Sequence, residues 1–322
     1  MVTGSKYAYV LGRVKALEAN LITKTQFNRM VEASSSSEAA KVLSETVYGD
    51  VEGADVETIE KILLEELKHV YDLVQHISPE REFTDLLQLK YDFHNVKAVL
   101  KSETVSREPQ HLVPLGVIDI DTLKRALEER LKDLPPPLAQ AVEKARHAYE
   151  KTGDTQVIDF VMDSEYTRIL REHAEKSPFL KEFVQLKIDL ENIRNFMRSQ
   201  RFNLDFTRVY LEGGTISLKT FENLEGESPE TVANVFSTKD YYSVVEEGLK
   251  DYENTQNLAQ YEKLSDDFLM EYIRKAKLVS LGIEPLIGYI LAKEMEIKQI
   301  RLILLGKLRG VEVGKRVSDP YV

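Results

Sequence analysis

Three short sets of polar residues have the residue types and the regular spacing needed for a repeated arrangement of hydrogen bonds and ion pairs. Each set contains a carboxylate, an amide three residues later and a basic side chain two residues after the amide. The sets are Asp92, Asn95 and Lys97, then Asp189, Asn192 and Arg194, and finally Glu296, Gln299 and Arg301. Such groups form hydrogen bonds and ion pairs. About one hundred residues separate successive sets, which is far longer than the period of a short solenoid repeat.

Two interpretations of these acid–amide–base sets remain open. In the first, the nine side chains hold helices or repeats of the protein together through hydrogen bonds and ion pairs. In the second, they face a central opening and contact a partner. We favour the first, because the carboxylates and amides lie beside an apolar stripe, and partly buried polar groups that must be hydrogen-bonded are usually architectural.

Each set lies on a segment with the periodicity of an amphipathic helix. The two well-defined copies are residues 88–102 and 185–199, and a looser copy is 293–306. Apolar residues recur at alternating spacings of three and four, which places them on one helical face. The carboxylate and amide fall on one margin of that face, and the basic residues fall on the other. The third copy differs because Lys293 lies within the apolar face.

The start of each repeat carries a helix N-cap signal. Thr23, Asp119 and Ser217 each follow an isoleucine, and their side chains can accept a hydrogen bond from an unpaired backbone amide. An apolar residue lies four positions after each cap, and these residues are Phe27, Leu123 and Phe221. The repeat therefore begins at a short capped helix and ends at the acid–amide helix.

These signals divide the chain into three helical repeats and a tail. A proline begins the last helix of each repeat, as prolines at helix N-termini do. The predicted repeats and the tail are residues 1–104, 113–200, 209–310 and 311–322. No segment of useful length has the alternation of a β-strand. The predicted fold class is all-α, with three homologous helical-bundle units that can close into a ring or cone with pseudo-threefold symmetry.

Composition argues against several classes of protein. The 322 residues are 43% hydrophobic and 30% charged, which is typical of a soluble, folded protein. A net charge of −11 argues against nucleic-acid binding and against direct binding to an anionic bilayer. The lack of cysteine excludes disulfides and Cys-ligated zinc. We expect a cytoplasmic protein, because no signal-peptide pattern and no apolar run of about 20 residues is present.

No pattern in the sequence supports catalysis or a cofactor. The six histidines include no pair at the i, i+3 or i, i+4 spacing of a helical metal site. Walker A, GxGxxG and GxSxG patterns are absent. The 54 carboxylates are so numerous that no chosen pair can nominate a general acid and base. We predict no catalytic residue, no metal, no cofactor and no small-molecule substrate.

The chain resembles the C subunit of the bacterial and archaeal V-type and A-type ATPases, the counterpart of the d subunit of the eukaryotic V-ATPase. The motifs that carry the resemblance span nearly the whole chain: YAYVLGRVKALEANLI, DFHNVKAVLK, DLENIRNFMR, EMEIKQIRLILLGKLRG and the Tyr321-Val322 ending. The resemblance implies a funnel of three similar helical domains on the cytoplasmic side of the membrane, seated on the proteolipid ring (c/L type). Its socket would receive the central-stalk subunits (D and F type).

The function that this resemblance implies is torque transmission without chemistry, in ATP-linked transport of protons or sodium. We hypothesise that the nine acid–amide–base residues are inter-repeat or socket positions, and that the short capped helices face the ring. The positions that mark these helices are Thr23, Phe27, Asp119, Leu123, Ser217 and Phe221. The negative net charge would complement basic stalk surfaces. The alternatives are a non-rotary triplicated scaffold or adaptor and, more remotely, a hydrolase with a concave polar site.

Overall fold

The computed structural model describes residues 2–322. It contains helices and connecting segments and, over this range, no β-strand. This confirms the predicted all-α class. The chain packs into two compact units, Met1–Arg81 with Glu227–Val322, and Glu82–Gly226. We call them the terminal unit and the central unit. The predicted division into three repeats and their arrangement as a funnel remain predictions.

The terminal unit combines helices from both ends of the sequence. Its α-helices are α1 (Val2–Glu18), α2 (Lys24–Glu32), α3 (Ser36–Leu43), α4 (Val56–Ile77), α11 (Pro229–Val235), α12 (Tyr242–Thr255), α13 (Ala259–Arg274) and α14 (Glu284–Leu308). Two 3-10 turns, Lys275–Leu278 and Gly314–Arg316, flank α14.

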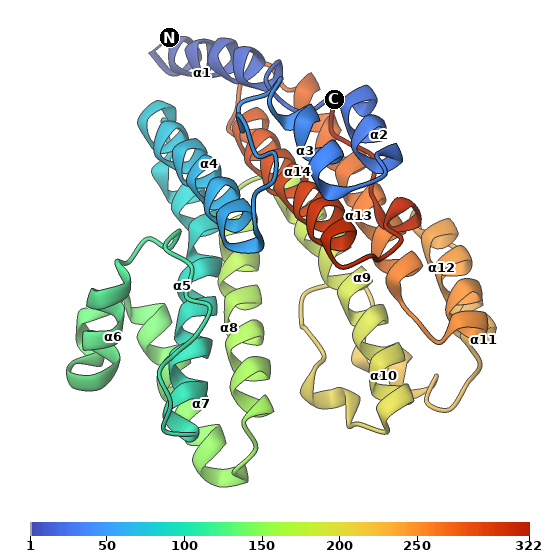
Figure 1. Ribbon diagram of the computed structural model, residues 1–322. Coiled ribbons are helices and arrows are strands. Elements are labelled where there is room, and N and C mark those ends of the chain that lie inside the picture. Colours follow the sequence, from blue (N-terminus) through green and yellow to red (C-terminus); the bar gives the residue numbers. More distant parts are fainter. Residues whose placement is uncertain (1) are drawn as a thin grey trace. The chain divides into compact units, whose positions relative to one another are not determined.

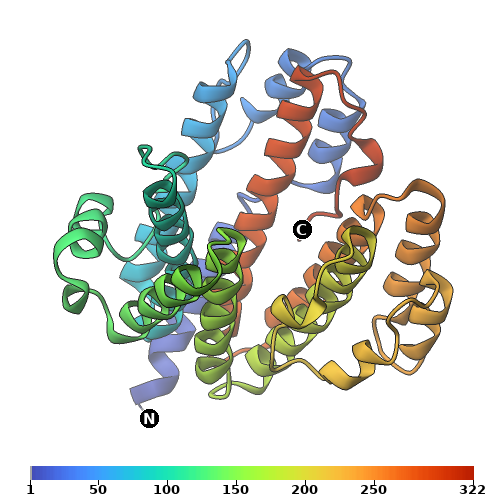
Figure 2. The same cartoon turned by 90° about the horizontal axis from the view of Figure 1, so that it is seen from below.

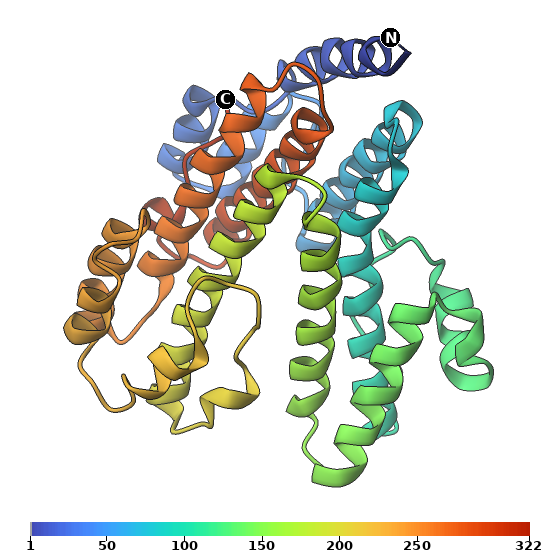
Figure 3. The same ribbon diagram turned by 180° about the vertical axis from the view of Figure 1, so that it is seen from behind.

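Helix α14 is the packing centre of the terminal unit. It contacts α1, α3, α4 and α13, and Figures 1 and 2 show it between α4 and the short helices α2 and α3. Its apolar side chains point in several directions, and Leu286, Ile290 and Ile300 are completely buried. A helix that is buried on several sides is apolar around most of its circumference. Helices α11, α12 and α13 form consecutive antiparallel pairs beyond it (Figure 3).

The central unit contains six α-helices among its described residues. They are α5 (Arg81–Thr104), α6 (Ile120–Glu129), α7 (Pro136–Thr152), α8 (Gln156–Ala174), α9 (Pro178–Phe202) and α10 (Leu218–Glu222). Short 3-10 turns lie at Leu131–Asp133 and Phe206–Arg208.

The core of the central unit follows the apolar stripe of α5. Phe93 and Val96 pack with residues of α6, α7 and α8 such as Leu123 and Met162. Helices α7 and α8 form a hairpin that turns at Gly153, whose φ of 66° is the left-handed conformation that glycine adopts at little cost. The interdigitated apolar side chains hold α5 firmly enough to position its polar edge.

The far end of α9 is closed by an aromatic cluster. Phe196 packs against Phe206 and Phe221, with ring centroids 5.2 and 5.3 Å apart, and Tyr210 lies beside them. Such tilted and edge-on contacts are the favourable arrangements of aromatic rings. The cluster fixes the segment between α9 and α10.

Most helix boundaries agree with the sequence signals. Thr23, Asp119 and Ser217 are N-caps of α2, α6 and α10, and each side chain accepts a backbone amide hydrogen bond. Thr23 forms a full capping box with Gln26. One boundary differs: α5 begins at Arg81, two residues after the proline that was expected to open it.

Candidate functional site: three strap sites on the long helices

The carboxylates and amides of the three polar sets are buried on the long helices α5, α9 and α14. Asp92, Asn95, Asp189 and Asn192 have no exposed surface, and Glu296 and Gln299 are 5% and 2% exposed. A buried carboxylate is costly unless it is hydrogen-bonded. For all of them except Gln299 the partner is the backbone of a segment that leads into a short capped helix, and Gln299 instead binds the backbone of Ser318. We call these segments straps, and the side chains that hold them strap sites.

The strap site on α5 holds residues 113–118. Asn95 donates to the carbonyl of Val113 and accepts from its amide, both at 2.8 Å. One turn earlier on the helix, Asp92 accepts from the amides of Val117 and Ile118 at 2.9 and 3.1 Å. The helix thereby satisfies backbone groups that regular secondary structure leaves unpaired.

The strap site on α9 repeats this arrangement with residues 211–216. Asn192 exchanges two hydrogen bonds of 2.8 Å with the backbone of Leu211. Asp189 accepts from the amides of Thr215 and Ile216 at 2.6 and 3.2 Å, and from the hydroxyl of Thr215. The same two residue types therefore hold the same two points of an equivalent strap.

The strap site on α14 holds two segments that are far apart in the sequence. Glu296 accepts from the amide of Ile22 at 2.5 Å, across 274 residues. Gln299 accepts from the amide of Ser318 at 2.9 Å. Ile22 precedes the cap of α2, just as Ile118 and Ile216 precede the caps of α6 and α10. The third site therefore uses the same classes of side chain at the same helix positions, but Gln299 makes one backbone bond where Asn95 and Asn192 make two, and its Nε2 donates to Met295 Sδ at 3.3 Å. Its strap is split between residues 20–22 and 318–321.

Glycines let the two continuous straps approach their carboxylates. A Cβ atom built on Gly116 would lie 2.1 Å from an Asp92 carboxylate oxygen, and one on Gly214 would lie 2.2 Å from an Asp189 oxygen. Each glycine stands two residues before the strap isoleucine, where the split strap has the exposed Asn20. Sequence reasoning missed these glycines, although the repeated Gly-x-Ile pattern before two caps was a usable signal.

The basic members of the sets form ion pairs of two kinds. Lys97 reaches Asp163 on α8 at 2.6 Å, and Arg301 reaches Glu60 on α4 at 2.8 Å. Arg194 instead pairs with Glu191 of its own helix at 2.6 Å. Its Nε is buried and has no hydrogen-bond partner among the described residues. The basic edge thus ties neighbouring helices together in the first and third copies, whereas the ion pair in the second copy, on α9, lies within one helix.

Lys293 lies in a buried ionic cluster beside the split strap. Its ammonium is 2.7 Å from Glu296 and 3.2 Å from Glu66, although the residue is only 1% exposed. The Tyr48 hydroxyl donates to Glu296 at 2.7 Å, and Lys293 lies over the Tyr48 ring. Burial, together with Glu296, raises the pKa of Tyr48, which keeps the phenol protonated as a donor. The equivalent positions on α5 and α9 are Leu89 and Leu186.

Burial in the strap site on α5 disfavours the ionised form of the Asp92 carboxyl. Burial raises its pKa from 3.8 to about 6, and the amides of Val117 and Ile118 oppose that rise by stabilising the carboxylate. Near neutral pH the group is largely ionised and holds the strap. A perturbed carboxyl also occurs in catalytic sites, but here the carboxylate oxygens accept hydrogen bonds from the protein's own backbone.

The apolar markers of the short capped helices point into the protein. Phe27 is 2% exposed, and Leu123 and Phe221 are not exposed at all. Their caps Thr23 and Asp119 lie at the surface. A partner that contacts α2, α6 or α10 would therefore meet the outward faces of these helices rather than their apolar markers.

The structure shows neither a metal cluster nor a membrane-spanning helix in the part of the chain that it describes. Over these residues no group of three or more His, Cys, Asp or Glu side chains is arranged to hold a metal ion. None of the described helices is long and apolar enough to cross a bilayer.

The fold and its strap sites define an all-helical scaffold whose buried polar side chains hold its own backbone. The chain belongs to the ATP synthase (C/AC39) subunit family, whose model matches residues 10–315. The resemblance seen in the sequence motifs is thereby confirmed.

Curated relatives match almost the whole chain. The C subunit of the A-type ATP synthase of Methanocaldococcus jannaschii is 26% identical, over 95% of this chain and 84% of the relative. The C subunit of the V-type sodium ATPase of Enterococcus hirae is 26% identical, over 91% of this chain and 92% of the relative. The C subunit of the A-type ATP synthase of Haloferax volcanii is 26% identical, over 96% of this chain and 95% of the relative.

Proposed function

We propose that this protein is a non-catalytic central-stalk subunit of a rotary V/A-type ATPase. It couples the rotating stalk, made of D- and F-type subunits, to the membrane proteolipid ring of c/L type. It lies on the cytoplasmic side of the membrane and transmits torque for ATP-linked transport of protons or sodium. The observation that carries this proposal is the family match over residues 10–315.

The strap sites support a mechanical role. Helices α5, α9 and α14 have 24, 25 and 25 residues, which corresponds to about 36–38 Å each at 1.5 Å per residue. A torque-transmitting subunit must resist shear between its helices and its connecting segments. Paired amide and carboxylate bonds to the backbone do this at both ends of each strap, because each strap is held at two points one helical turn apart.

The chemistry of the buried groups also favours a structural protein over an enzyme. A catalytic carboxylate needs access to a substrate within hydrogen-bonding distance. Asp92 and Asp189 have no exposed surface, and they accept hydrogen bonds from the strap backbone and from the Thr215 hydroxyl. The buried acids and amides of the three sets therefore fit the interpretation that they hold helices or repeats together better than direct contact with a stalk.

Binding to the purified D- and F-type stalk pair across a salt series tests the proposal. We expect saturable, stoichiometric binding that weakens as salt rises, because a chain with a net charge of −11 would meet basic stalk surfaces. Absence of binding at low salt, with a sample that is helical by circular dichroism, would contradict the proposal. It would leave the alternative of a non-rotary triplicated scaffold.

The position of the ring contacts can be tested separately. We propose that the ring meets the outward faces of α2, α6 and α10, where Thr25, Asp121 and Lys219 occupy the second position after each cap and are exposed. The chain has no cysteine, so single-cysteine variants at these positions can be labelled specifically. Bound rings should slow maleimide labelling at all three positions.

A cysteine at Lys250 on α12, which is also exposed, provides the matched control for this labelling. Its rate should not change when rings are added. Equal labelling with and without rings at the three cap positions, in a preparation where rings do bind, would place the contact elsewhere.

A further inference from the structure

Residues 317–322 occupy, on the third long helix, the place that a continuous strap occupies on the first two. Ser318 bonds to Gln299 as Val113 bonds to Asn95 and as Leu211 bonds to Asn192. In the central unit the chain then continues for a few residues to the carboxylate contact. On α14 the carboxylate contact is made by Ile22, which lies near the other end of the sequence.

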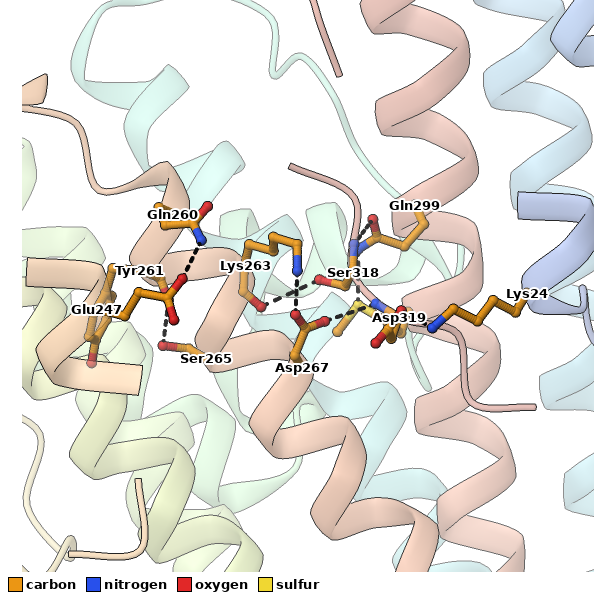
Figure 4. A network of polar contacts seen from close by, with 11 residues as sticks. Lys24, Glu247, Gln260, Tyr261, Lys263, Ser265, Asp267, Gln299, Ser318 and Asp319 are labelled. Carbon is orange, nitrogen blue, oxygen red and sulfur yellow. Dashed lines mark hydrogen bonds and ion pairs between the residues drawn. The ribbon is translucent and has the colours of Figure 1, made fainter. Parts of the chain in front are cut away.

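The backbone of this segment is bound at several further points. The amide of Asp319 donates to Asp267 at 2.9 Å, and Asp267 is itself held by Lys263 at 2.6 Å (Figure 4). The Asp319 carboxylate lies 3.0 Å from Lys24 at the start of α2. The segment therefore contacts α13, α14 and α2 at once, and Ser318 is only 2% exposed.

Tyr321 anchors the end of the segment in a closely lined site. Its hydroxyl donates to Glu18 of α1 at 3.1 Å, and the residue is 5% exposed. Arg274 donates to the carbonyls of Pro320 and Tyr321, and Lys277 donates to the Tyr321 carbonyl while lying over its ring. A side chain on Gly288 would approach the Tyr321 hydroxyl within 3.3 Å.

These contacts have the features of a peptide-binding site. The segment has no regular secondary structure, its backbone amides and carbonyls are bound by side chains, and one aromatic residue fills a buried position. A small cavity of about 10 Å³ remains between Tyr321, Pro320 and the segment that includes Leu21 and Ile22. The two parts of the split strap therefore adjoin, although no short stretch of chain joins them.

We propose that α13 and α14 form a peptide-binding site whose ligand is the protein's own segment 317–322, and that this segment is a detachable clasp. While bound, the clasp holds the strap residues 20–22, and with them α2, against α14. When the clasp is released, the Ile22–Glu296 contact loses its neighbouring support. The two continuous straps of the central unit have no comparable point of opening, because their two contacts belong to one short loop.

Removal of residues 317–322 and their return as a separate peptide test the proposal. Hydrogen exchange is followed in fragments that contain Ile22, Ile118 and Ile216, the three equivalent amides. Without the clasp, exchange at Ile22 should accelerate at least tenfold, whereas exchange at Ile118 and Ile216 should stay unchanged. Acetyl-VSDPYV, added at saturating concentration, should restore slow exchange at Ile22.

The same peptide with the Tyr321→Ala change is the matched control and should not restore slow exchange. Unchanged exchange at Ile22 after truncation, or equal acceleration at all three isoleucines, would overturn the proposal. If the truncated chain does not fold, full-length Tyr321→Ala and Tyr321→Phe provide the same comparison. The alanine variant should then accelerate exchange at Ile22 more than the phenylalanine variant does.

Discussion

The continuous straps of the central unit and the split strap of the terminal unit are both bound by a carboxylate and an amide of a long helix. They differ in whether the two bound residues are neighbours in the sequence. On α5 and α9 the amide and the carboxylate grip two points of one loop, such as Val113 and Ile118. On α14 they grip Ser318 and Ile22. The entropic cost of joining two points rises with the length of chain between them, so the split strap needs support that the continuous straps do not.

The additional support comes from a buried ionic cluster around the split strap. Lys293, Glu66 and Tyr48 surround Glu296, and Glu18 binds Tyr321. The equivalent sites on α5 and α9 have a leucine in place of Lys293. Replacing a buried ion pair by an apolar pair is often neutral or stabilising, whereas removing one of its partners is strongly destabilising. We hypothesise that the cluster favours the correct joining of two distant segments, because either acid without Lys293, or Lys293 without the acids, would be buried with an uncompensated charge.

Removal of the Glu296 carboxylate should have the largest effect. Glu296→Ala leaves Lys293 buried with Glu66 as its remaining ion-pair partner, which should cost about 3–5 kcal/mol of unfolding free energy. Asp92→Ala, in a continuous strap, should cost about 1–3 kcal/mol because it leaves only backbone amides unpaired. Denaturant unfolding followed by circular dichroism measures both. Equal losses would remove the distinction between the two kinds of strap.

The Lys293→Leu change sharpens that experiment. It installs the residue type found on α5 and α9, so the double variant with Glu296→Ala should recover part of the stability lost in the single variant. Absence of coupling between the two changes would show that the buried ion pair does not account for the larger loss.

The next effect is the pH dependence of the α5 strap site. Because the folded pKa of Asp92 is about 6 and the unfolded value is 3.8, protonation stabilises the folded state. This contribution is complete below about pH 4 and is lost as pH rises through 6, with an upper limit of about 3 kcal/mol. Carboxyl NMR titration should give a pKa near 6. Relative to Asp92→Asn, the wild-type protein should lose stability between pH 4 and pH 7.

Alanine at the strap glycines should have a moderate effect. Gly116→Ala and Gly214→Ala push a methyl group into a hydrogen-bonded carboxylate, which should cost about 1–2 kcal/mol through weakened strap bonds. Asn20→Ala, the matched change in the split strap, is at an exposed position and should change stability by less than about 0.5 kcal/mol. Melting temperatures of the three variants test this order.

Removal of a basic side chain from the edge of a long helix should have the smallest effect on the free energy of unfolding. Arg301 and Glu60 form an ion pair whose side chains are 42% and 38% exposed. Arg301→Ala should therefore cost less than about 1 kcal/mol, and added salt should reduce the difference further. A loss as large as that of Asp92→Ala would mean that the ion pair, rather than the buried acid, sets the position of the helix.

Local signals in the sequence were sufficient to predict the helices and to recognise that the three polar sets occupy equivalent positions. Capping residues, prolines at helix starts and apolar spacing act over a few residues, so they can be recognised without the tertiary structure. Thr23, Asp119 and Ser217 were identified as caps for this reason. The same local information placed Asp92, Asp189 and Glu296 at equivalent helix positions. It could not identify the backbone amides that bond to these carboxylates.

Only the tertiary structure decided what those carboxylates hold and how the third strap is completed. A carboxylate can accept a hydrogen bond from any buried donor within reach. The packing of segments that are distant in the sequence determines which donor lies beside it. Thus Asp92 meets Ile118, whereas Glu296 meets Ile22 across 274 residues. The sequence by itself determined the repeated helices and their polar edges. Long-range packing decided that Lys293 is paired rather than exposed, and that residues 317–322 complete a strap that begins at the other end of the chain.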